Sequence, residues 1–263
     1  MKIATWNVNS IRTRQGIVVD WLKQHQVDIL CLQETKVIDA DFPRQPFSEL
    51  GYNLYISGQK AYNGVAIFSR QELTDVSCGF SPIIPSEAAA KFDEQKRLIT
   101  GVIDNLRIVN VYVPNGAPLG SEKYEYKLAW LKMLKTYLLK LRQANSLELC
   151  VSGDFNIAPR DKDIYTTKNR DKHIMSSPAE REALQDLLSI GLADAFRKFT
   201  CEPGHYTWWD YRAAAFQRNR GWRIDHHYLT PIAYEQAISC TIDVEPRKLE
   251  RPSDHVPVIL ELP

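Results

Sequence analysis

The feature that most constrains this chain is the segment 149–156, Leu-Cys-Val-Ser-Gly-Asp-Phe-Asn, in which a short apolar run ends in Gly153. Side chains alternate between the two faces of an extended segment, so Asp154 and Asn156 lie on one face at the end of a strand. A turn that only closes the strand is the plain alternative, because Asp and Asn are common turn residues. The same arrangement at other strand ends favours a functional site.

The composition is that of a globular protein with a substantial core. The chain has 263 residues, of which 44% are hydrophobic, and its formal net charge is +1. This length suffices for one large domain or two small ones. We find no internal repeat, low-complexity tract or flexible linker, and therefore expect a single domain over residues 1–263. A nearly neutral chain can contact nucleic acid only through a local basic face.

The cysteines and the N-terminus indicate a reducing compartment. The five cysteines are scattered and never spaced as Cys-x-x-Cys, and three of them lie in apolar runs, so we expect no disulfide bonds. The first residues enter a strand-like pattern without the apolar region of a signal peptide, and no window approaches the length of a membrane span. We expect a cytoplasmic monomer with no membrane contact.

Hydrophobic periodicity predicts an α/β unit followed by densely spaced strands, which indicate antiparallel sheet. Strands are expected at 2–8, 27–32, 52–57, 64–69, 73–80, 97–103, 106–113, 149–153, 222–229, 235–244 and 256–262. Helices are expected at 11–25, 122–143 and 177–190. The segment 158–175 is polar and has no periodicity, so we expect a long surface loop there.

Four of these strands are flanked by polar side chains of the same kind. The residues are Asn7, Asn9, Glu34, Asp154, Asn156, Asp254 and His255. If the strands lie side by side, their ends meet and form a cluster of oxygen donors. Such a cluster suits Mg²⁺, with Mn²⁺ as a substitute, better than Zn²⁺, which favours Cys and several His. Because Mg²⁺ leaves room for phosphate oxygens, the cluster indicates phosphoryl chemistry.

Two further residues fit this chemistry. Tyr112 lies at a strand end, although a tyrosine there is more often a packing residue. Asp225 is a candidate partner for His255, because a carboxylate beside an imidazole fixes its tautomer and favours its charged form. Of the adjacent His226 and His227, we expect one to be buried and one exposed, and neither to bind zinc.

Seven motifs resemble the exonuclease III family of abasic-site endonucleases, within the DNase I-like endonuclease/exonuclease/phosphatase superfamily, and the resemblance is to a bacterial-type member. They are Thr-Trp-Asn-Val-Asn-Ser-Ile-Arg at 5–12, Leu-Gln-Glu-Thr-Lys at 32–36, Tyr-Asn-Gly-Val-Ala-Ile at 62–67, Tyr-Val-Pro-Asn-Gly at 112–116, Gly-Asp-Phe-Asn at 153–156, Gly-Trp-Arg-Ile-Asp at 221–225 and Ser-Asp-His-Val-Pro at 253–257. Each is weak alone, but seven in the family's order are specific. The resemblance implies a four-layer α/β sandwich with two mixed β-sheets face to face and helices outside.

The resemblance also implies a DNA repair nuclease with one catalytic domain over 1–263. Such an enzyme uses Mg²⁺ to hydrolyse the phosphodiester 5′ to an abasic site in double-stranded DNA. Exonuclease activity from the 3′ end and 3′-phosphatase or phosphodiesterase activity are further family properties, so the expected partner is duplex DNA with abasic sites or blocked 3′ ends. The alternatives are a phosphoesterase of the same fold acting on an inositol phosphate or sphingomyelin, and a catalytically silent DNA-binding protein.

The family's pattern implies which residues hold the metal. Glu34 resembles the principal ligand, with Asn9 and Asp254 nearby. A second or moving metal position would involve Asn7, Asp154, Asn156 and His255. Because Asn9 stands where some family members have aspartate, the site carries one negative charge less and we expect a single principal metal.

The same pattern implies separate roles in catalysis. Asp154 would activate the attacking water or protonate the leaving group. His255, oriented by Asp225, would donate to a phosphate oxygen. Three groups would hold the scissile phosphate and its developing charge: Asn7, Tyr112 and Asn156.

An aromatic and basic segment at 206–223 is the expected DNA-contacting region. Trp208 and Trp222 resemble family residues that wall a narrow apolar pocket for a flipped deoxyribose lacking its base. Arg212 matches a family position that probes the DNA groove, whereas we assign Trp209 to packing. Further phosphate contacts are expected from Lys36, Tyr62, Arg97 and Asn115.

Overall fold

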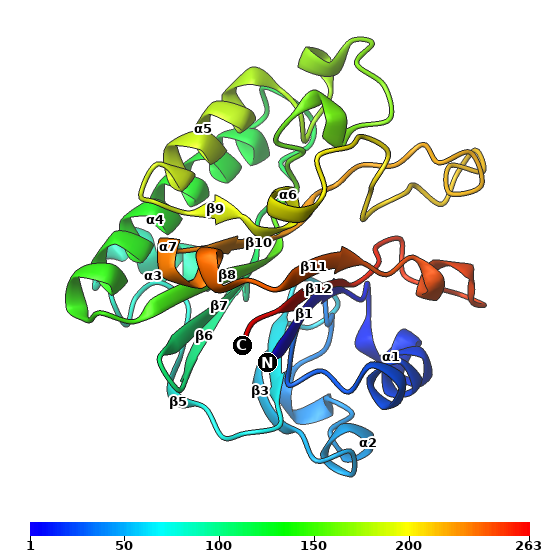
Figure 1. Cartoon of the computed structure of the whole chain (residues 1–263). Helices are drawn as coiled ribbons and strands as arrows, with labels where there is room; N and C mark the ends of the chain where they lie inside the picture. The colour runs from blue at the N-terminus through cyan, green and yellow to red at the C-terminus, as the bar shows by residue number, and fades with distance from the viewer.

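The structure, a computed structural model, describes residues 1–263 and is built on two six-stranded β-sheets (Figure 1). The first, in the order β11-β12-β1-β2-β4-β3, comprises β1 (Lys2–Asn7), β2 (Ile29–Gln33), β3 (Asn53–Ser57), β4 (Val65–Ser69), β11 (Ser239–Ile242) and β12 (Val258–Glu261). The second, in the order β5-β6-β7-β8-β10-β9, comprises β5 (Thr74–Cys78), β6 (Leu98–Ile103), β7 (Leu106–Tyr112), β8 (Glu148–Asp154), β9 (Ala193–Asp194) and β10 (Asp225–Leu229). The pairs β1–β2 and β7–β8 are parallel and the others antiparallel, so both sheets are mixed.

Helices cover the outer faces of the two sheets. They are α1 (Ile11–His25), α2 (Gln45–Ser48), α3 (Glu87–Asp93), α4 (Glu122–Ala144) and α5 (Pro178–Leu188). The short helices α6 (Ala195–Phe199) and α7 (Pro231–Gln236) instead contribute residues to the core between the sheets. Short 3₁₀ turns lie at Asp39–Asp41, Asp161–Asp163, Arg170–Lys172 and Glu245–Lys248. Figure 1 shows α1 and α2 on one side of the sheets and α3, α4 and α5 on the other. Each helical layer shares an apolar core with its sheet, and a third core lies between the sheets. The predicted four-layer sandwich is confirmed.

Local sequence signals explain where α4 and α5 begin. Ser121 caps α4 by accepting a hydrogen bond from the backbone N–H of Tyr124. Ser177 and Glu180 form a capping box at the start of α5, with Pro178 in its first turn. The loop after β7 leads into α4, and the long loop after β8 leads into α5. No helix combines the length and the apolar character that crossing a bilayer requires.

Buried polar side chains tie the two sheets together near one edge. Asn110 on β7 donates to the backbone carbonyls of Leu32 (3.0 Å) and Ala66 (2.8 Å) in the first sheet. Gln33 at the end of β2 donates to Asn110 Oδ1 at 2.8 Å and to Thr5 Oγ1 at 2.9 Å. Because buried polar groups are costly unless they are paired, these bonds favour one alignment of the sheets.

The C-terminal part of the chain departs from the predicted strands. The strand expected at 235–244 is only β11, because Pro231 starts the short helix α7 and occupies the preceding residues. The strand expected at 222–229 begins at Asp225, and Trp222 instead forms isolated bridges with Ile164 and Trp208. The short helices α2, α3, α6 and α7 were not predicted, since a few turns carry little periodicity.

The prediction of a surface loop at 158–175 is partly wrong, because part of this segment is buried in the protein. Asp163 is fully buried and forms ion pairs with Arg223, at 2.7 Å, and with Arg197. Although burial opposes ionisation, the two guanidinium groups lower the pKa of Asp163 to about 2. A buried carboxylate therefore holds the loop to α6 and to Arg223, which lies just before β10.

His226 and His227 are both buried, so the prediction that one of them is exposed is wrong. Their side chains alternate across β10, but this strand has a covered face on each side. The Nε2 atom of His226 donates to the carbonyl of Ile157, and that of His227 donates to the carbonyl of Val258, each at 3.0 Å. His227 also bonds Ser152 Oγ through Nδ1 at 2.7 Å. The pair has a structural role in β10.

We expect the protein to lose stability in acid because His226 and His227 are buried. Burial lowers the pKa of His226 and of His227 from 6.5 to about 4, so the unfolded chain takes up protons first. The free energy of unfolding should therefore fall as the pH decreases from about 6.5 toward 4. Urea unfolding at about pH 7 and about pH 5 measures this loss, which should be smaller in a His226→Gln/His227→Gln variant than in the wild type. An equal loss in both proteins would contradict the assignment.

Candidate active site

The predicted site residues meet where strands of both sheets end. Asn7 is the last residue of β1, and Glu34 directly follows β2. In the second sheet, Asp154 is the last residue of β8. Its direct partners on the neighbouring strands are Tyr112, at the end of β7, and Asp225, at the start of β10. Two parallel pairs thus place their carboxyl ends at one edge of the sandwich.

Asn7 links the two sheets inside the site. Its Nδ2 atom donates to Glu34 Oε1 at 2.8 Å and to Asp154 Oδ2 at 2.9 Å. Its backbone carbonyl accepts a hydrogen bond from Ser253 Oγ at 2.7 Å. Asn7 is fully buried, so one carboxamide holds a carboxylate from each sheet at a defined separation.

Asp154 is a buried carboxyl group whose pKa lies well above the ordinary value. Its Oδ1 atom accepts from the backbone N–H of Asn156 at 2.8 Å. Burial raises the pKa of Asp154 from 3.8 to about 7, against the opposing effect of His255. A carboxyl group with such a pKa can take up and release a proton near neutral pH, as general acid–base catalysis requires.

His255 contacts Asp225, the partner predicted for it. Its Nδ1 atom lies 2.9 Å from Asp225 Oδ2, and its Nε2 atom lies 3.8 Å from Asp154 Oδ2. Although burial opposes charging, Asp225 and Asp154 raise the pKa of His255 to about 10. The imidazolium is therefore charged at neutral pH, with Nδ1–H directed to Asp225 and Nε2–H available to a second acceptor.

The oxygen donors fit a hard divalent cation. Single donor atoms of Glu34, Asp154 and His255 lie within 4.8 Å of one another. Lys36 Nζ lies 2.8 Å from Glu34 Oε2 and 2.6 Å from Asn9 Oδ1, so these two oxygens already surround a positive charge. Carboxylate and amide oxygens around a cation are the donor set of Mg²⁺. The contact also places Lys36 inside the site rather than on the outer surface.

Asp254 lies to one side of this cluster. Its Oδ1 atom accepts from Asn9 Nδ2 at 3.0 Å, and its Oδ2 atom accepts from Trp208 Nε1 at 2.9 Å. Asp254 therefore connects the candidate metal site with the tryptophan that was expected to wall the sugar pocket.

The backbone of the site is unusual. Asn9, Glu34 and Asn156 all have left-handed conformations, with φ of 44°, 51° and 51°. Asparagine tolerates this region, but a glutamate in it is uncommon. Such residues cluster at functional sites, where the surrounding structure holds them.

Tyr112 and Asn156, which were predicted to hold the phosphate, both lie beside Asp154. Burial, together with Glu34, raises the pKa of Tyr112 well above its ordinary value, so the phenol stays protonated and can donate. Arg97 lies over the Tyr112 ring at 4.6 Å. Asn115 Nδ2 donates to Asn156 Oδ1 at 3.1 Å, and Asn156 Nδ2 donates to the Val113 carbonyl at 2.9 Å.

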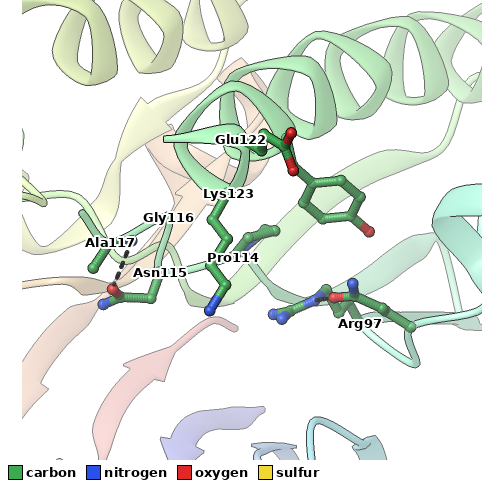
Figure 2. Close-up of a pocket in the computed structure, with 9 residues that line it drawn as sticks. Arg97, Pro114, Asn115, Gly116, Ala117, Glu122 and Lys123 are labelled. Carbon is green, nitrogen blue, oxygen red and sulfur yellow. Dashed lines mark hydrogen bonds between the residues drawn. The ribbon is translucent and has the colours of Figure 1, made fainter. Parts of the chain in front are cut away.

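A cavity of about 610 Å³ opens beside Asn115 (Figure 2). Figure 2 shows the side chains of Arg97 and Lys123 pointing toward each other across it. Lys123 forms no ion pair, so its ammonium group is free for an anion. Sequence reasoning named Arg97 and Asn115 but missed Lys123; its position at the start of a helix, shortly after the Pro-Asn-Gly motif, was the available signal.

A second hollow, of about 630 Å³, lies at Trp208 and Trp222. The two backbones exchange hydrogen bonds of 2.9 Å, which places both indole rings on the same side of the bridge. His173 and Met175, which belong to the segment expected as a long surface loop, also line this hollow. Arg212 lies on its rim with a largely exposed side chain paired to Asp210.

Two further aromatic residues named from the sequence differ in their exposure. Tyr62 is 70% exposed and stands on a loop between β3 and β4. Trp209, which we assigned to packing, is buried and packs edge-on against Phe216, with ring centroids 5.1 Å apart.

Gly153 explains how Asp154 reaches its position. Its φ is 148°, and a Cβ atom there would collide with the backbone carbonyl oxygen of Val111 on β7. We expect Gly153→Ala to lower the free energy of unfolding by at least about 2 kcal/mol. Gly204→Ala is the control, since Gly204 also has positive φ but a Cβ atom there would meet no heavy atom within 4 Å. Urea unfolding compares the two; equal losses would contradict the steric explanation.

Comparisons with known proteins agree with this geometry. Residues 4–255 match the Endonuclease/Exonuclease/phosphatase family. The chain is 35% identical to an exodeoxyribonuclease of Bacillus subtilis, over 99% of this chain and 98% of the relative. Two solved structures are each 40% identical to this chain, and each alignment covers 100% of this chain and 99% of the solved chain. One is an AP endonuclease from Archaeoglobus fulgidus, with a TM-score of 0.91. The other is the 3′ phosphatase NExo from Neisseria, bound to a product DNA hairpin, with a TM-score of 0.93. The chain therefore belongs to the endonuclease/exonuclease/phosphatase family, among its exodeoxyribonuclease and AP endonuclease members.

Proposed function

We propose that this phosphodiester hydrolase is a DNA repair nuclease that cleaves 5′ to abasic sites in double-stranded DNA and also removes nucleotides and phosphate from 3′ ends. The observation that carries the proposal is the buried set in which Asn7 joins Glu34 to Asp154 and Asp225 orients a charged His255. Relatives named as exodeoxyribonuclease, AP endonuclease and 3′ phosphatase support it. We further propose one domain over 1–263 acting as a cytoplasmic monomer.

Mg²⁺ is the proposed cation, with Mn²⁺ as a substitute, and Glu34 is its principal ligand. Asn9 contributes an amide oxygen, and Asp254 holds Asn9 in place. When bound, the cation neutralises charge on the phosphate oxygens. Lys36 competes for the same two oxygens, so its contact with a DNA phosphate requires it to turn away from Glu34.

The protein's own groups account for proton transfer and phosphate binding. Asp154 takes a proton from the attacking water or gives one to the leaving oxygen, as its raised pKa permits. His255 donates from Nε2 to a nonbridging phosphate oxygen while Asp225 holds Nδ1–H. The neutral donors that surround the phosphate are Asn7, Tyr112 and Asn156. Preorganised donors of this kind stabilise charge that develops in the transition state.

DNA contacts extend on both sides of this centre. Trp208 and Trp222 form an apolar wall against which a sugar that lacks its base would pack. Backbone phosphates are proposed to contact Lys36, Tyr62, Arg97, Asn115, Lys123 and Arg212. The cations among them form the local basic face that a chain of net charge +1 needs.

Substitution of the proton-transferring pair tests the proposal. We expect Asp154→Asn and His255→Ala each to lower kcat by at least about 10²-fold while duplex affinity changes by only a few fold. Cleavage of a labelled duplex with one stable abasic analogue measures kcat, with an intact duplex and an inositol phosphate assayed in parallel. Asp186→Asn, on the exposed face of α5, is the control. Hydrolysis of the inositol phosphate with no cut in the abasic duplex would refute the proposed substrate.

Metal removal tests the role of Glu34. Chelation by EDTA should abolish cleavage, and added Mg²⁺ or Mn²⁺ should restore it. Glu34→Gln should raise the Mg²⁺ concentration needed for half-maximal activity by about 10-fold or more, because a charged ligand is lost. A titration of activity against Mg²⁺ for both proteins measures the shift. Coincident titration curves would remove Glu34 from the metal site.

A further inference from the structure

A buried ion pair lies next to the site but takes no part in the chemistry described so far. Lys127 on α4 and Glu180 on α5 are in direct contact, and both side chains are 0% exposed. The two helices lie side by side over the second sheet (Figure 1). Charged side chains are rarely buried so completely, even in pairs. This pair therefore calls for a specific explanation.

The ammonium group of Lys127 holds two loops of the active site. Besides Glu180, Nζ donates to the backbone carbonyl of Asn156 at 2.8 Å and to that of Asn115 at 3.1 Å. All three N–H bonds thus have an acceptor. Gly116 makes room for the lysine, because a Cβ atom there would lie 2.9 Å from Lys127 Cδ. The two residues held in this way are the asparagines that bond to each other beside Asp154.

The carboxylate of Glu180 holds the other side of the site. Its Oε1 atom accepts from the backbone N–H of Met175 at 3.0 Å. Its Oε2 atom accepts from the backbone N–H and the hydroxyl of Ser177, at 3.1 and 2.7 Å. Met175 lines the hollow at Trp222, so the ion pair spans from the phosphate-binding asparagines to the proposed sugar pocket.

Stability alone does not explain a charged pair at this position. Burial lowers the pKa of Lys127, which shows that its charge is held at a cost despite Glu180. Well-packed apolar residues of similar volume are often as stable as a buried ion pair or more so. The same helices are already joined by the exposed pair Lys135 and Asp186, at 2.6 Å. An apolar pair could not, however, donate to the carbonyls of the two site loops.

We propose that Lys127 and Glu180 are positioning residues for phosphodiester hydrolysis, which fix the phosphate-binding loops and the sugar pocket relative to each other. Neither residue touches the reacting atoms. The inference rests on the proposed function insofar as it assigns the phosphate to Asn115 and Asn156 and the sugar to the hollow. A misplacement of about 1 Å in such groups costs on the order of 10²-fold in rate.

The test replaces the ion pair by apolar residues of similar size. A Lys127→Met/Glu180→Leu variant leaves the backbone groups bound by the pair without partners, so its urea midpoint should fall. Under conditions where it is still folded, it should lose about 10- to 100-fold in kcat on the abasic duplex, with KM changed by less than about threefold. Lys127→Arg, which keeps a charged donor, should recover part of kcat. Lys135→Met/Asp186→Leu removes the exposed pair between the same helices and should leave both stability and kcat unchanged.

Hydrogen–deuterium exchange gives a readout that does not depend on the substrate. Segments 113–117 and 154–158 should exchange faster in the apolar variant than in the wild type and in the Lys135 control. If the wild-type protein does not cleave abasic DNA, the proposed function is refuted. The exchange rates of the two loops can still be compared in that case, so the positioning role is tested separately.

Two results would overturn the inference. One is wild-type kcat together with unchanged exchange in the apolar variant, which would make the pair purely structural. If the apolar variant does not fold, Glu180→Gln replaces it, because this substitution keeps the side-chain volume but removes the charge. Normal kcat and exchange in that variant would show that the charged pair is not needed.

Discussion

The arrangement of the whole site depends on the alignment of two separate sheets, and a single carboxamide marks that alignment. Asn7 ends a strand of the first sheet and donates to Asp154 at the end of a strand of the second, as well as to Glu34. Deeper between the sheets, Asn110 and Gln33 form a second bridge. Apolar packing tolerates small sliding movements, but buried polar groups lose their partners when the sheets shift. The polar bridges therefore define where the catalytic edge lies.

The pKa values of both Asp154 and His255 are raised in the site, but by different causes. Asp154 sits among backbone and carboxamide groups with little water, and its pKa rises to about 7. His255 is equally buried, yet two carboxylates keep it charged. The contrast follows from the local charges, because desolvation and a neighbouring acid raise the pKa of a carboxyl group, whereas neighbouring carboxylates raise the pKa of an imidazole and keep it charged. One buried cluster can thus contain both a proton-transferring group and a fixed cation.

Buried ion pairs anchor the loops around the site at several points. Asp163 is held by Arg223 and Arg197, and Glu180 is held by Lys127. Both carboxylates belong to the stretch between β8 and the first turn of α5, which also supplies residues to the hollow at Trp222. A polar segment that was expected to be a long surface loop is thus held at two internal positions. Rigid loops suit a site in which phosphate and sugar must be held together.

Much of this site was predictable from ordered motifs, because polar residues at strand ends are local signals. Alternation and spacing placed Asp154 with Asn156, and suggested Asp225 as the neighbour of His255. Features that depend on what covers a segment were not predictable. The sequence could not show that both faces of β10 are covered, and so one of its two histidines was wrongly expected to be exposed. It also gave no sign that Lys127 and Glu180, far apart in the chain, meet under the site.

By itself, the sequence determined the family through seven ordered motifs, and the resemblance to that family implied the four-layer class of fold. Hydrophobic periodicity placed the strands and thereby the residue types at their ends. Only the tertiary structure decided how the residues pair. Whether Lys36 faces Glu34, whether Asp154 is buried enough to hold a proton near pH 7, and which loops the Lys127–Glu180 pair joins all depend on distances between distant segments. Charge states and hydrogen bonds vary steeply with such distances and with burial, which the order of residues does not contain.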